Sequence, residues 1–220
     1  MRNKVDIPFE NAIQAGGRVV RHDKEGKLVE APSGVWMLRQ PNESVCRAWL
    51  AGLDRQKVEV MMVQGKKARD LAMVTLGFSS AHACQLVVWP NSKAPATALT
   101  LSFRKARADD LDFITSRYDL LEREELAAYI DNGYLWIALH EQTPIGFVGR
   151  HAEGSMGLLE VFEPFRRHGF GAQLETFMIG QMLSEGFTPY ADVFADNGNS
   201  LSLQRKLGMT FVPCETFWLF

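Results

Sequence analysis

The feature that most constrains the fold of this chain is a glycine-containing segment, residues 166–172, which lies between a strand pattern and the clearest helix pattern. Glycine lets the backbone turn tightly and lets a ligand approach without a clash with a Cβ atom. The first N–H groups of a helix have no intrahelical partner and lie at the positive end of the helix dipole. The segment therefore predicts a strand–turn–helix unit with an anion site suited to a pyrophosphate, to which Arg166 or Arg167 could add positive charge.

Two better-known phosphate motifs are excluded by spacing. The segment matches neither the GxxxxGK[ST] pattern of P-loop proteins nor the GxGxxG pattern of dinucleotide-binding folds. Taken alone, an R-x-x-G-x-G string is also compatible with a plain strand–helix turn that binds nothing.

Hydrophobic periodicity predicts ten elements in the second half of the chain. Strands are expected at 100–104, 134–139, 145–149, 156–162, 190–194 and 210–220, and helices at 109–114, 122–130, 172–185 and 200–206. The order β-α-α-β-β-β-α-β-α-β predicts an α/β (α+β) fold with an antiparallel start, and it differs from a doubly wound nucleotide fold.

Composition narrows the class of protein. The formal net charge is −2 and the chain has no long basic run, so nucleic acid is not an expected partner. No apolar stretch approaches the roughly 20 residues that span a membrane, and the first residues do not resemble a secretory signal. Three cysteines without a CxxC pair and five scattered histidines predict no disulfide framework and no metal site. We expect a cytoplasmic protein.

A proline-containing segment at 90–97 predicts a linker and a domain boundary near residue 98. We expect an N-terminal α/β domain at 1–97 and a second domain at 98–220. The pattern at 68–89, a helix, a Leu-Gly-Phe stop and an apolar strand, is similar to the pattern at 200–219. This similarity indicates either a degenerate internal repeat or the coincidence of two ordinary helix–glycine–strand units.

The second half resembles the GNAT superfamily of CoA-dependent N-acetyltransferases. Residues 159–171 are similar to the family's R/Q-x-x-G-x-G/A signature with its preceding strand, and 197–209 are similar to its second signature, which ends in Lys-Leu-Gly-Met. Residues 103–111 resemble the family's first strand and helix. The resemblance implies a mostly antiparallel mixed sheet flanked by helices. The two-part layout looks like the FR47-like and glycine N-acyltransferase-like branches, which implies a degenerate GNAT-like first half.

The resemblance also implies an acyl-CoA site, with acetyl-CoA as the co-substrate. The backbone of Val161 and its neighbours would pair with the pantetheine arm, the amides of 167–172 would hold the pyrophosphate, and Asn197 would lie near the thioester. The implied cofactor-binding residues are Val161, Phe162, Arg166, Arg167, His168, Gly169, Phe170, Gly171, Ala172, Asn197, Ser200 and Gln204.

The catalytic groups depart from the family pattern. Gln204 stands where many members have a tyrosine that protonates the leaving thiolate, although a thiolate with a pKa near 8 to 9 needs little protonation. Ser155 and Gly157 stand where a base on the fourth strand would be, and neither is a credible base. Strand alternation places Glu160 on the face opposite Gly157, unless a bulge intervenes.

Several acid–base candidates therefore stay open. Our catalytic candidates are Glu160, Glu153, Ser155 and Tyr190. Glu160 could instead be a structural carboxylate bonded to a neighbouring helix or an arginine. Tyr190 and Tyr134 could be packing residues, and Asp192, Asp196 or a water relay are further candidates. We expect Asp196 to cap the helix that follows it.

The resulting hypothesis is transfer of an acetyl or other short acyl group from acyl-CoA to a primary amine of a small molecule or amino acid. Direct attack in a ternary complex is expected, because no histidine flanks Cys214 to make it a nucleophile. The alternatives are a CoA-binding or interaction protein that has lost catalysis, and an α/β domain whose turn binds nothing. The sequence leaves the acceptor and a homodimer open.

Overall fold

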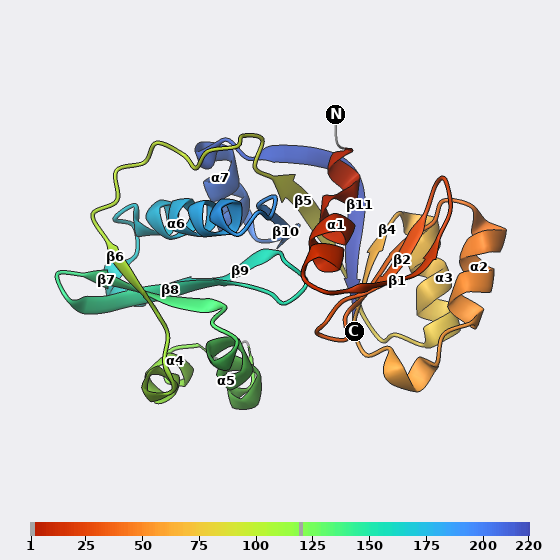
Figure 1. The fold of residues 1–220 in the computed structure, drawn as a ribbon, viewed down its shortest axis with the longest axis horizontal. Helices are drawn as coiled ribbons and strands as arrows, with labels where there is room; N and C mark the ends of the chain where they lie inside the picture. The colour runs from red at the N-terminus through yellow and green to blue at the C-terminus, as the bar shows by residue number, and fades with distance from the viewer. Residues whose placement is uncertain (1–2, 119–120) are drawn as a thin grey trace. The chain divides into compact units, whose positions relative to one another are not determined.

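The computed structural model describes residues 3–118 and 121–220, which form two compact units (Figure 1). The first unit contains the residues up to Pro90 together with Ala152–Ser155 and Tyr190–Phe220. The second contains Asn91–His151 and Met156–Pro189. The units are therefore interleaved in the sequence, and the last strands of the chain belong with the N-terminal strands.

The first unit is built on a seven-stranded sheet with the order β1-β2-β3-β4-β11-β5-β10. Neighbouring strands are antiparallel except for β3 and β4, which are parallel. The strands are β1 (Arg18–His22), β2 (Lys27–Glu30), β3 (Trp36–Arg39), β4 (Met61–Gln64), β5 (Ala81–Val88), β10 (Tyr190–Phe194) and β11 (Thr210–Leu219).

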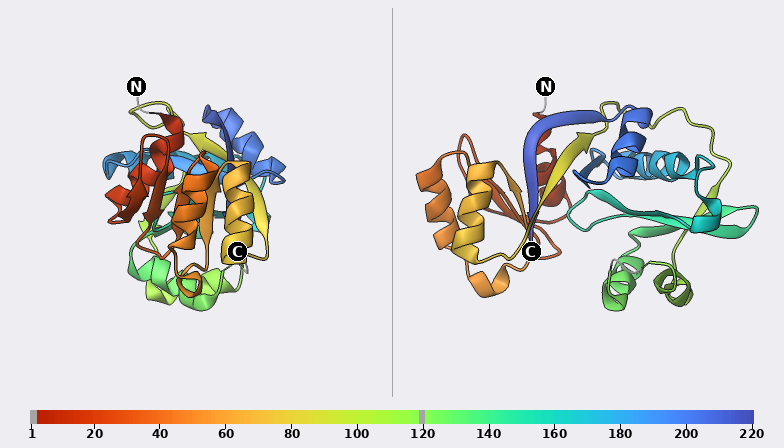
Figure 2. Two further views of the ribbon diagram at one scale, coloured as in Figure 1. Left: turned by 90° about the vertical axis from the view of Figure 1, so that its right-hand side faces the viewer. Right: turned by 180° about the vertical axis from the view of Figure 1, so that it is seen from behind.

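Helices cover both faces of this sheet (Figures 1 and 2). The alternation of strand β2 shows why: Leu28 packs with the α2 and α3 side, whereas Val29 packs with Phe9 of α1. The helical segments of this unit are η1 (Lys4–Asp6), α1 (Ile7–Gln14), α2 (Glu43–Ala51), η2 (Arg55–Lys57), α3 (Lys66–Leu76) and α7 (Gly198–Leu207).

The second unit is a four-stranded antiparallel sheet, β6-β7-β8-β9, between two helical layers (Figure 1). Helix α6 packs on one face, where Phe177 stacks on Phe103 at 3.9 Å between ring centroids. Helices α4 and α5 close the other face around a core that includes Phe147 and Leu158. The elements are β6 (Ser102–Lys105), η3 (Ala108–Asp110), α4 (Leu111–Thr115), α5 (Arg123–Asp131), β7 (Leu135–His140), β8 (Thr143–Arg150), β9 (Met156–Val161), η4 (Glu163–Phe165) and α6 (Phe170–Ser184).

The expected fold class is confirmed. All ten elements expected in the second half are present in the expected order, and β10 has the expected bounds. In the first half the helix–strand pair α3–β5 was expected from its pattern, whereas α1, α2 and strands β1 to β4 were not assigned. These elements are short, and tertiary packing decides their conformation more than local pattern does.

Strand β9 contains a bulge. Glu160 lies opposite Phe147 and Gly157 lies opposite Gly149, so two residues of β9 face the single residue between them on β8. The first of the two, Leu158, has a left-handed φ of 52°. The expectation from simple alternation is therefore wrong: Glu160 and Gly157 point to the same face, because residues opposite Phe147 and Gly149 share their direction.

Within the described residues, no helix is both long and apolar enough to span a membrane.

Candidate functional site

The glycine-containing turn leads from the end of β9 into α6 and has an unusual backbone. Arg167 and Gly169 both adopt left-handed conformations, with φ of 68° and 80°. Gly169 is the N-cap residue of α6, and no side chain caps this helix end. A Cβ atom placed on Gly169 would meet nothing within 4 Å. The start of α6 is therefore open, and its first N–H groups are available to an anion.

The two arginines of the turn differ in what they do. Arg166 donates from Nε to the Val161 carbonyl and from Nη2 to Glu160 Oε1, both at 2.8 Å. The Glu160 carboxylate raises the pKa of the Arg166 guanidinium. Arg167 is exposed. The free positive charge beside the open helix end is therefore that of Arg167, and Glu160 is the structural partner of an arginine.

Strand β9 presents one backbone edge outward. The Phe162 N–H donates to the Ile145 carbonyl of the neighbouring chain segment, so the N–H and carbonyl of Val161 point the other way. Since the Val161 carbonyl accepts from Arg166, its N–H is the backbone group of Val161 left for a ligand. Phe162 itself is buried against Phe113 and Phe147, which argues against a role for its side chain in ligand binding.

The remaining residues of the turn are exposed or partly exposed. The Phe170 ring has two aromatic neighbours. Its centroid lies 5.9 Å from that of His168 and 5.2 Å from that of His140. The Ala172 N–H donates to the Gly169 carbonyl at 3.2 Å, so this amide belongs to the helix. Of the amides expected to hold the pyrophosphate, Gly171 is therefore the last one that is free.

The second signature, residues 197–209, contains the whole of α7 in the first unit. Asn197 is its N-cap residue and accepts a hydrogen bond from the Ser200 N–H at 3.0 Å. Asn197 thus caps the helix, a role expected for Asp196. Gln204 is only 2% exposed, so its amide is turned inward within this unit.

A buried acidic cluster lies in the first unit. Ser155 Oγ donates to Glu153 Oε1 at 2.6 Å, and both side chains are 3% exposed. The segment that carries them is held by Asn11, whose Nδ2 donates to the Gly154 carbonyl at 2.9 Å. Tyr190 is fully buried; burial raises its pKa, and the charges of Glu153 and Asp192 raise it further. The structure thus brings together three of the four catalytic candidates.

Asp192 belongs to the same cluster. Burial raises its pKa to about 7, although the Trp218 indole, which donates to Oδ2 at 3.3 Å, acts in the opposite direction. The charge of Glu153 adds to the increase. Oδ1 of Asp192 is buried without a hydrogen-bond partner among the described residues. Asp192 is thus a carboxyl group whose charge changes near neutral pH.

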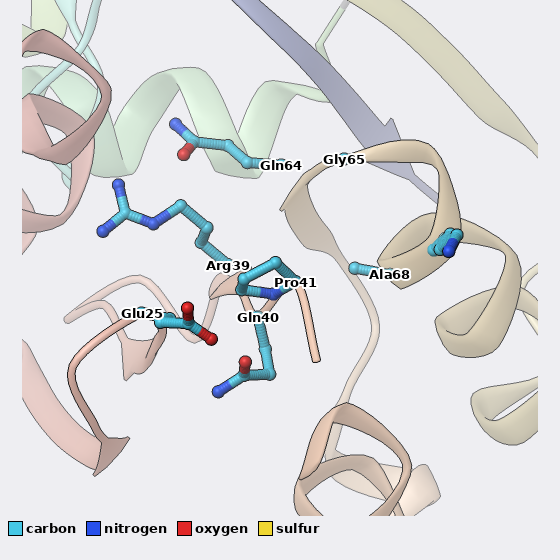
Figure 3. Close-up of a pocket in the computed structure, with 8 residues that line it drawn as sticks. Glu25, Arg39, Gln40, Pro41, Gln64, Gly65 and Ala68 are labelled. Carbon is cyan, nitrogen blue, oxygen red and sulfur yellow. The ribbon is translucent and has the colours of Figure 1, made fainter. Parts of the chain in front are cut away.

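The first unit also has a shallow pocket of about 250 Å³ at the ends of β3 and β4 (Figure 3). Two of its polar side chains already stabilise the fold: Arg39 pairs with Asp6, and Gln64 donates to the Val5 carbonyl. Both side chains extend to the same side in Figure 3, and their partners Asp6 and Val5 belong to η1. The described residues contain no cluster of three or more His, Cys, Asp or Glu suited to a metal ion.

One polar group near β9 was missed by the sequence analysis. His151 follows β8 directly, and its Nδ1 lies 2.8 Å from the Tyr129 hydroxyl of α5. Its ring lies against Gly157 of β9. The five histidines are scattered in the sequence, and only the fold brings His151 to this strand.

Residues 100–209 match the model of the acetyltransferase (GNAT) family. No curated protein matches the chain. Among solved structures, a Drosophila protein is similar over 100% of this chain and 90% of its own, with 15% identity and a TM-score of 0.70.

Two further structures share the fold. A GNAT-family acetyltransferase from Colwellia psychrerythraea covers 100% of this chain and 97% of its own, with 13% identity and a TM-score of 0.57. A tandem GNAT protein from the clavulanic acid biosynthesis pathway covers 98% of this chain and 87% of its own, with 13% identity and a TM-score of 0.51. With the family model spanning half of the sequence, the chain belongs to the acetyltransferase (GNAT) family.

Proposed function

We propose that this protein transfers an acetyl or other short acyl group from acyl-CoA to a primary amine of a small molecule or amino acid. The observation that carries the proposal is the open turn before α6, with left-handed Arg167 and Gly169 and an uncapped helix start. Such a turn offers convergent N–H donors and a positive dipole end to a pyrophosphate.

The residues of the turn fit the pyrophosphate of CoA. The amides of 168–171 would hold the phosphates, and the exposed Arg167 would add charge. The N–H of Val161, on the outer edge of β9, would donate to the pantetheine arm like a neighbouring strand. Arg166 would hold the end of β9 in place through the Val161 carbonyl and Glu160.

Direct transfer from CoA to the amine fits the chemistry of the cysteines. Burial raises the pKa of Cys84 and Cys214, which keeps both thiols protonated and weakly nucleophilic at neutral pH. The amine nitrogen would form the new bond to the thioester carbonyl carbon, and the C–S bond would break with the electron pair leaving on sulfur.

A second candidate is a CoA-binding protein with impaired catalysis. The specific observation in its favour is Gln204, a buried amide at the position where the family resemblance implies a tyrosine. An amide cannot protonate a leaving thiolate at neutral pH.

The deciding experiment measures release of free CoA thiol from acetyl-CoA, propionyl-CoA and octanoyl-CoA in the presence of a panel of primary amines. The panel contains glycine, other amino acids, arylalkylamines and polyamines. We expect thiol release that depends on one class of amine, with the acylated amine identified by mass spectrometry. Saturable acetyl-CoA binding without transfer to any amine would support the impaired protein instead.

A further inference from the structure

An imidazole occupies the place of a side chain on strand β9. Gly157 has no side chain, and a Cβ atom added there would lie 2.2 Å from Nε2 of His151 and 2.6 Å from its Cδ2. The His151 ring therefore fills the space that a residue at position 157 would use. Because of the bulge, this space is on the face of the sheet that α4 and α5 cover.

The imidazole is oriented from its other nitrogen. Nδ1 of His151 lies 2.8 Å from the Tyr129 hydroxyl, and the two rings meet edge to face at 80°. A tyrosine oxygen can accept a hydrogen bond as well as donate one. When Nδ1–H donates to Tyr129, the lone pair of Nε2 is free and faces β9. Among the described residues, Nε2 has no hydrogen-bond partner.

The other ionisable groups near this part of β9 are already engaged. Glu160 is paired with Arg166. Arg150, the neighbour of His151 in the chain, pairs with Glu185 and lies over the Tyr134 ring. Tyr129 is the titratable group in contact with the imidazole. Among the described residues, the imidazole of His151 is thus the acid–base group at this strand that no ion pair engages.

We propose that His151 is the general base of the reaction and that Tyr129 is its positioning residue. This inference rests on the proposed function. As the amine nitrogen bonds to the thioester carbonyl carbon, the proton of the amine passes to His151 Nε2. The C–S bond breaks, and its electron pair leaves on the CoA sulfur. The imidazolium then returns its proton to solvent.

The first test needs no knowledge of the acceptor. Histidine ring ¹⁵N chemical shifts, recorded at pH 8 with and without acetyl-CoA, report which nitrogen of neutral His151 carries the proton, and the His151→Gln variant assigns the signal. We expect the Nδ1–H form in the wild type and a mixture in Tyr129→Phe. A dominant Nε2–H form in the wild type would overturn the proposal, because that nitrogen could not accept a proton.

The second test compares kinetics across pH 5–9, using acetyl-CoA and the most active amine of the panel. General-base catalysis contributes about 10²–10⁴-fold to rate. We expect His151→Gln to lower kcat at least about 10²-fold and to remove the fall in rate at low pH, with KM for acetyl-CoA changed less than about threefold. Gly157→Ala, whose methyl group would displace the imidazole, should lower kcat in the same direction.

The control is His22→Gln, which removes an exposed histidine at the end of β1 and should leave the profile unchanged. An active wild type whose profile survives in folded His151→Gln would overturn the role of His151, and so would loss of the low-pH limb in Asp192→Asn alone. A wild type that acylates no amine would instead contradict the proposed function itself.

Discussion

At the scale of single residues, Asp192 is the clearest case of a group kept at a cost to stability. Its pKa is about 7 in the folded protein, mainly because of burial, against about 3.9 for an aspartate in an unfolded chain. Between these two values the folded state holds a proton that the unfolded state releases. Stability therefore falls as pH rises from about 4 to 7, by up to roughly 4 kcal/mol.

Replacement of this carboxyl group by an amide should remove that cost. We predict that Asp192→Asn is more stable than the wild type at pH 8 by about 1–3 kcal/mol, and that the gain shrinks toward pH 4. An asparagine oxygen can still accept from the Trp218 indole. Chemical denaturation of both proteins at several pH values measures the difference. A variant that is less stable at pH 8 would contradict the burial of an ionised carboxylate here.

Gly169 tests the anion turn. A β-branched residue at its φ of 80° is strained by roughly 1–2 kcal/mol, yet the space around a Cβ atom is empty. We predict that Gly169→Val folds but binds acetyl-CoA about tenfold or more weakly, because the turn relaxes and the methyl groups cover the amides. Isothermal titration calorimetry measures the Kd.

The matched control for this change is Gly34→Val. Gly34 has a φ of 82° and equally empty surroundings, and it lies in the turn between β2 and β3 of the first unit. The Gly34→Val substitution should lower the stability by a similar amount and leave the Kd for acetyl-CoA unchanged. Equal affinity of folded Gly169→Val and the wild type would mean that the pyrophosphate site is elsewhere.

The sequence allowed the turn to be located but not the partners of its charges. The spacing of Gly169 and Gly171 after a strand pattern was sufficient to predict an open helix start. That Arg166 would be engaged by Glu160, and that His151 would lie against Gly157, depends on contacts made by the fold. The spacing of these residues along the sequence does not indicate that they are in contact.

At the scale of secondary-structure elements, the β9 bulge explains one wrong expectation. Alternation assigns side chains to faces only while each residue has one partner, and the pair Leu158–Leu159 opposes a single residue of β8. A leucine with positive φ has no local sequence signature, unlike a glycine. The face on which Glu160 lies therefore could not be predicted from spacing.

The parallel pair β3–β4 shows how the first half differs from the second. These strands are paired along four residues, from Trp36 opposite Met61 to Arg39 opposite Gln64. The connection that follows β3 has no glycine turn, and Asn42 accepts hydrogen bonds from the first N–H groups of α2. The β3–α2 connection therefore offers a CoA molecule neither an open strand edge nor free helix amides.

We therefore predict one acetyl-CoA site per chain. Calorimetry or native mass spectrometry should give a stoichiometry of one, and Gly169→Val should weaken that single site. A second equivalent of acetyl-CoA that binds with similar affinity, and that Gly169→Val leaves intact, would show that the first half has kept a site of its own.

At the scale of the whole molecule, the boundary expected from the sequence near residue 98 does not coincide with the division into compact units. We keep residues 1–97 and 98–220 as a proposal for two encoded halves, supported by the helix–strand similarity of α3–β5 and α7–β11 and by the family match over 100–209. In the folded protein, however, β11 lies between β4 and β5 in the seven-stranded sheet of the first unit. Strand order across such a distance could not be predicted from local patterns.

The position of β11 between β4 and β5 has a direct consequence for an isolated first half. Without β11, strands β4 and β5 are no longer joined in one sheet. Core residues such as Val63 also lose their packing neighbours Phe217 and Leu219. We predict that a fragment of residues 1–97 does not fold by itself. Far-ultraviolet circular dichroism and limited proteolysis measure this, and a cooperative thermal transition of the fragment would contradict the prediction.

The measurement that tests the central claim most directly is a thermal-shift titration of the full chain with acetyl-CoA at matched ionic strength. A ligand that binds only the folded state stabilises it by roughly 2.7 kcal/mol at 100 times its Kd. We predict a saturable rise in Tm that is lost in Gly169→Val and retained in Gly34→Val. No shift at millimolar acetyl-CoA, or with octanoyl-CoA in its place, would contradict the assignment of this protein as an acyl-CoA-dependent transferase.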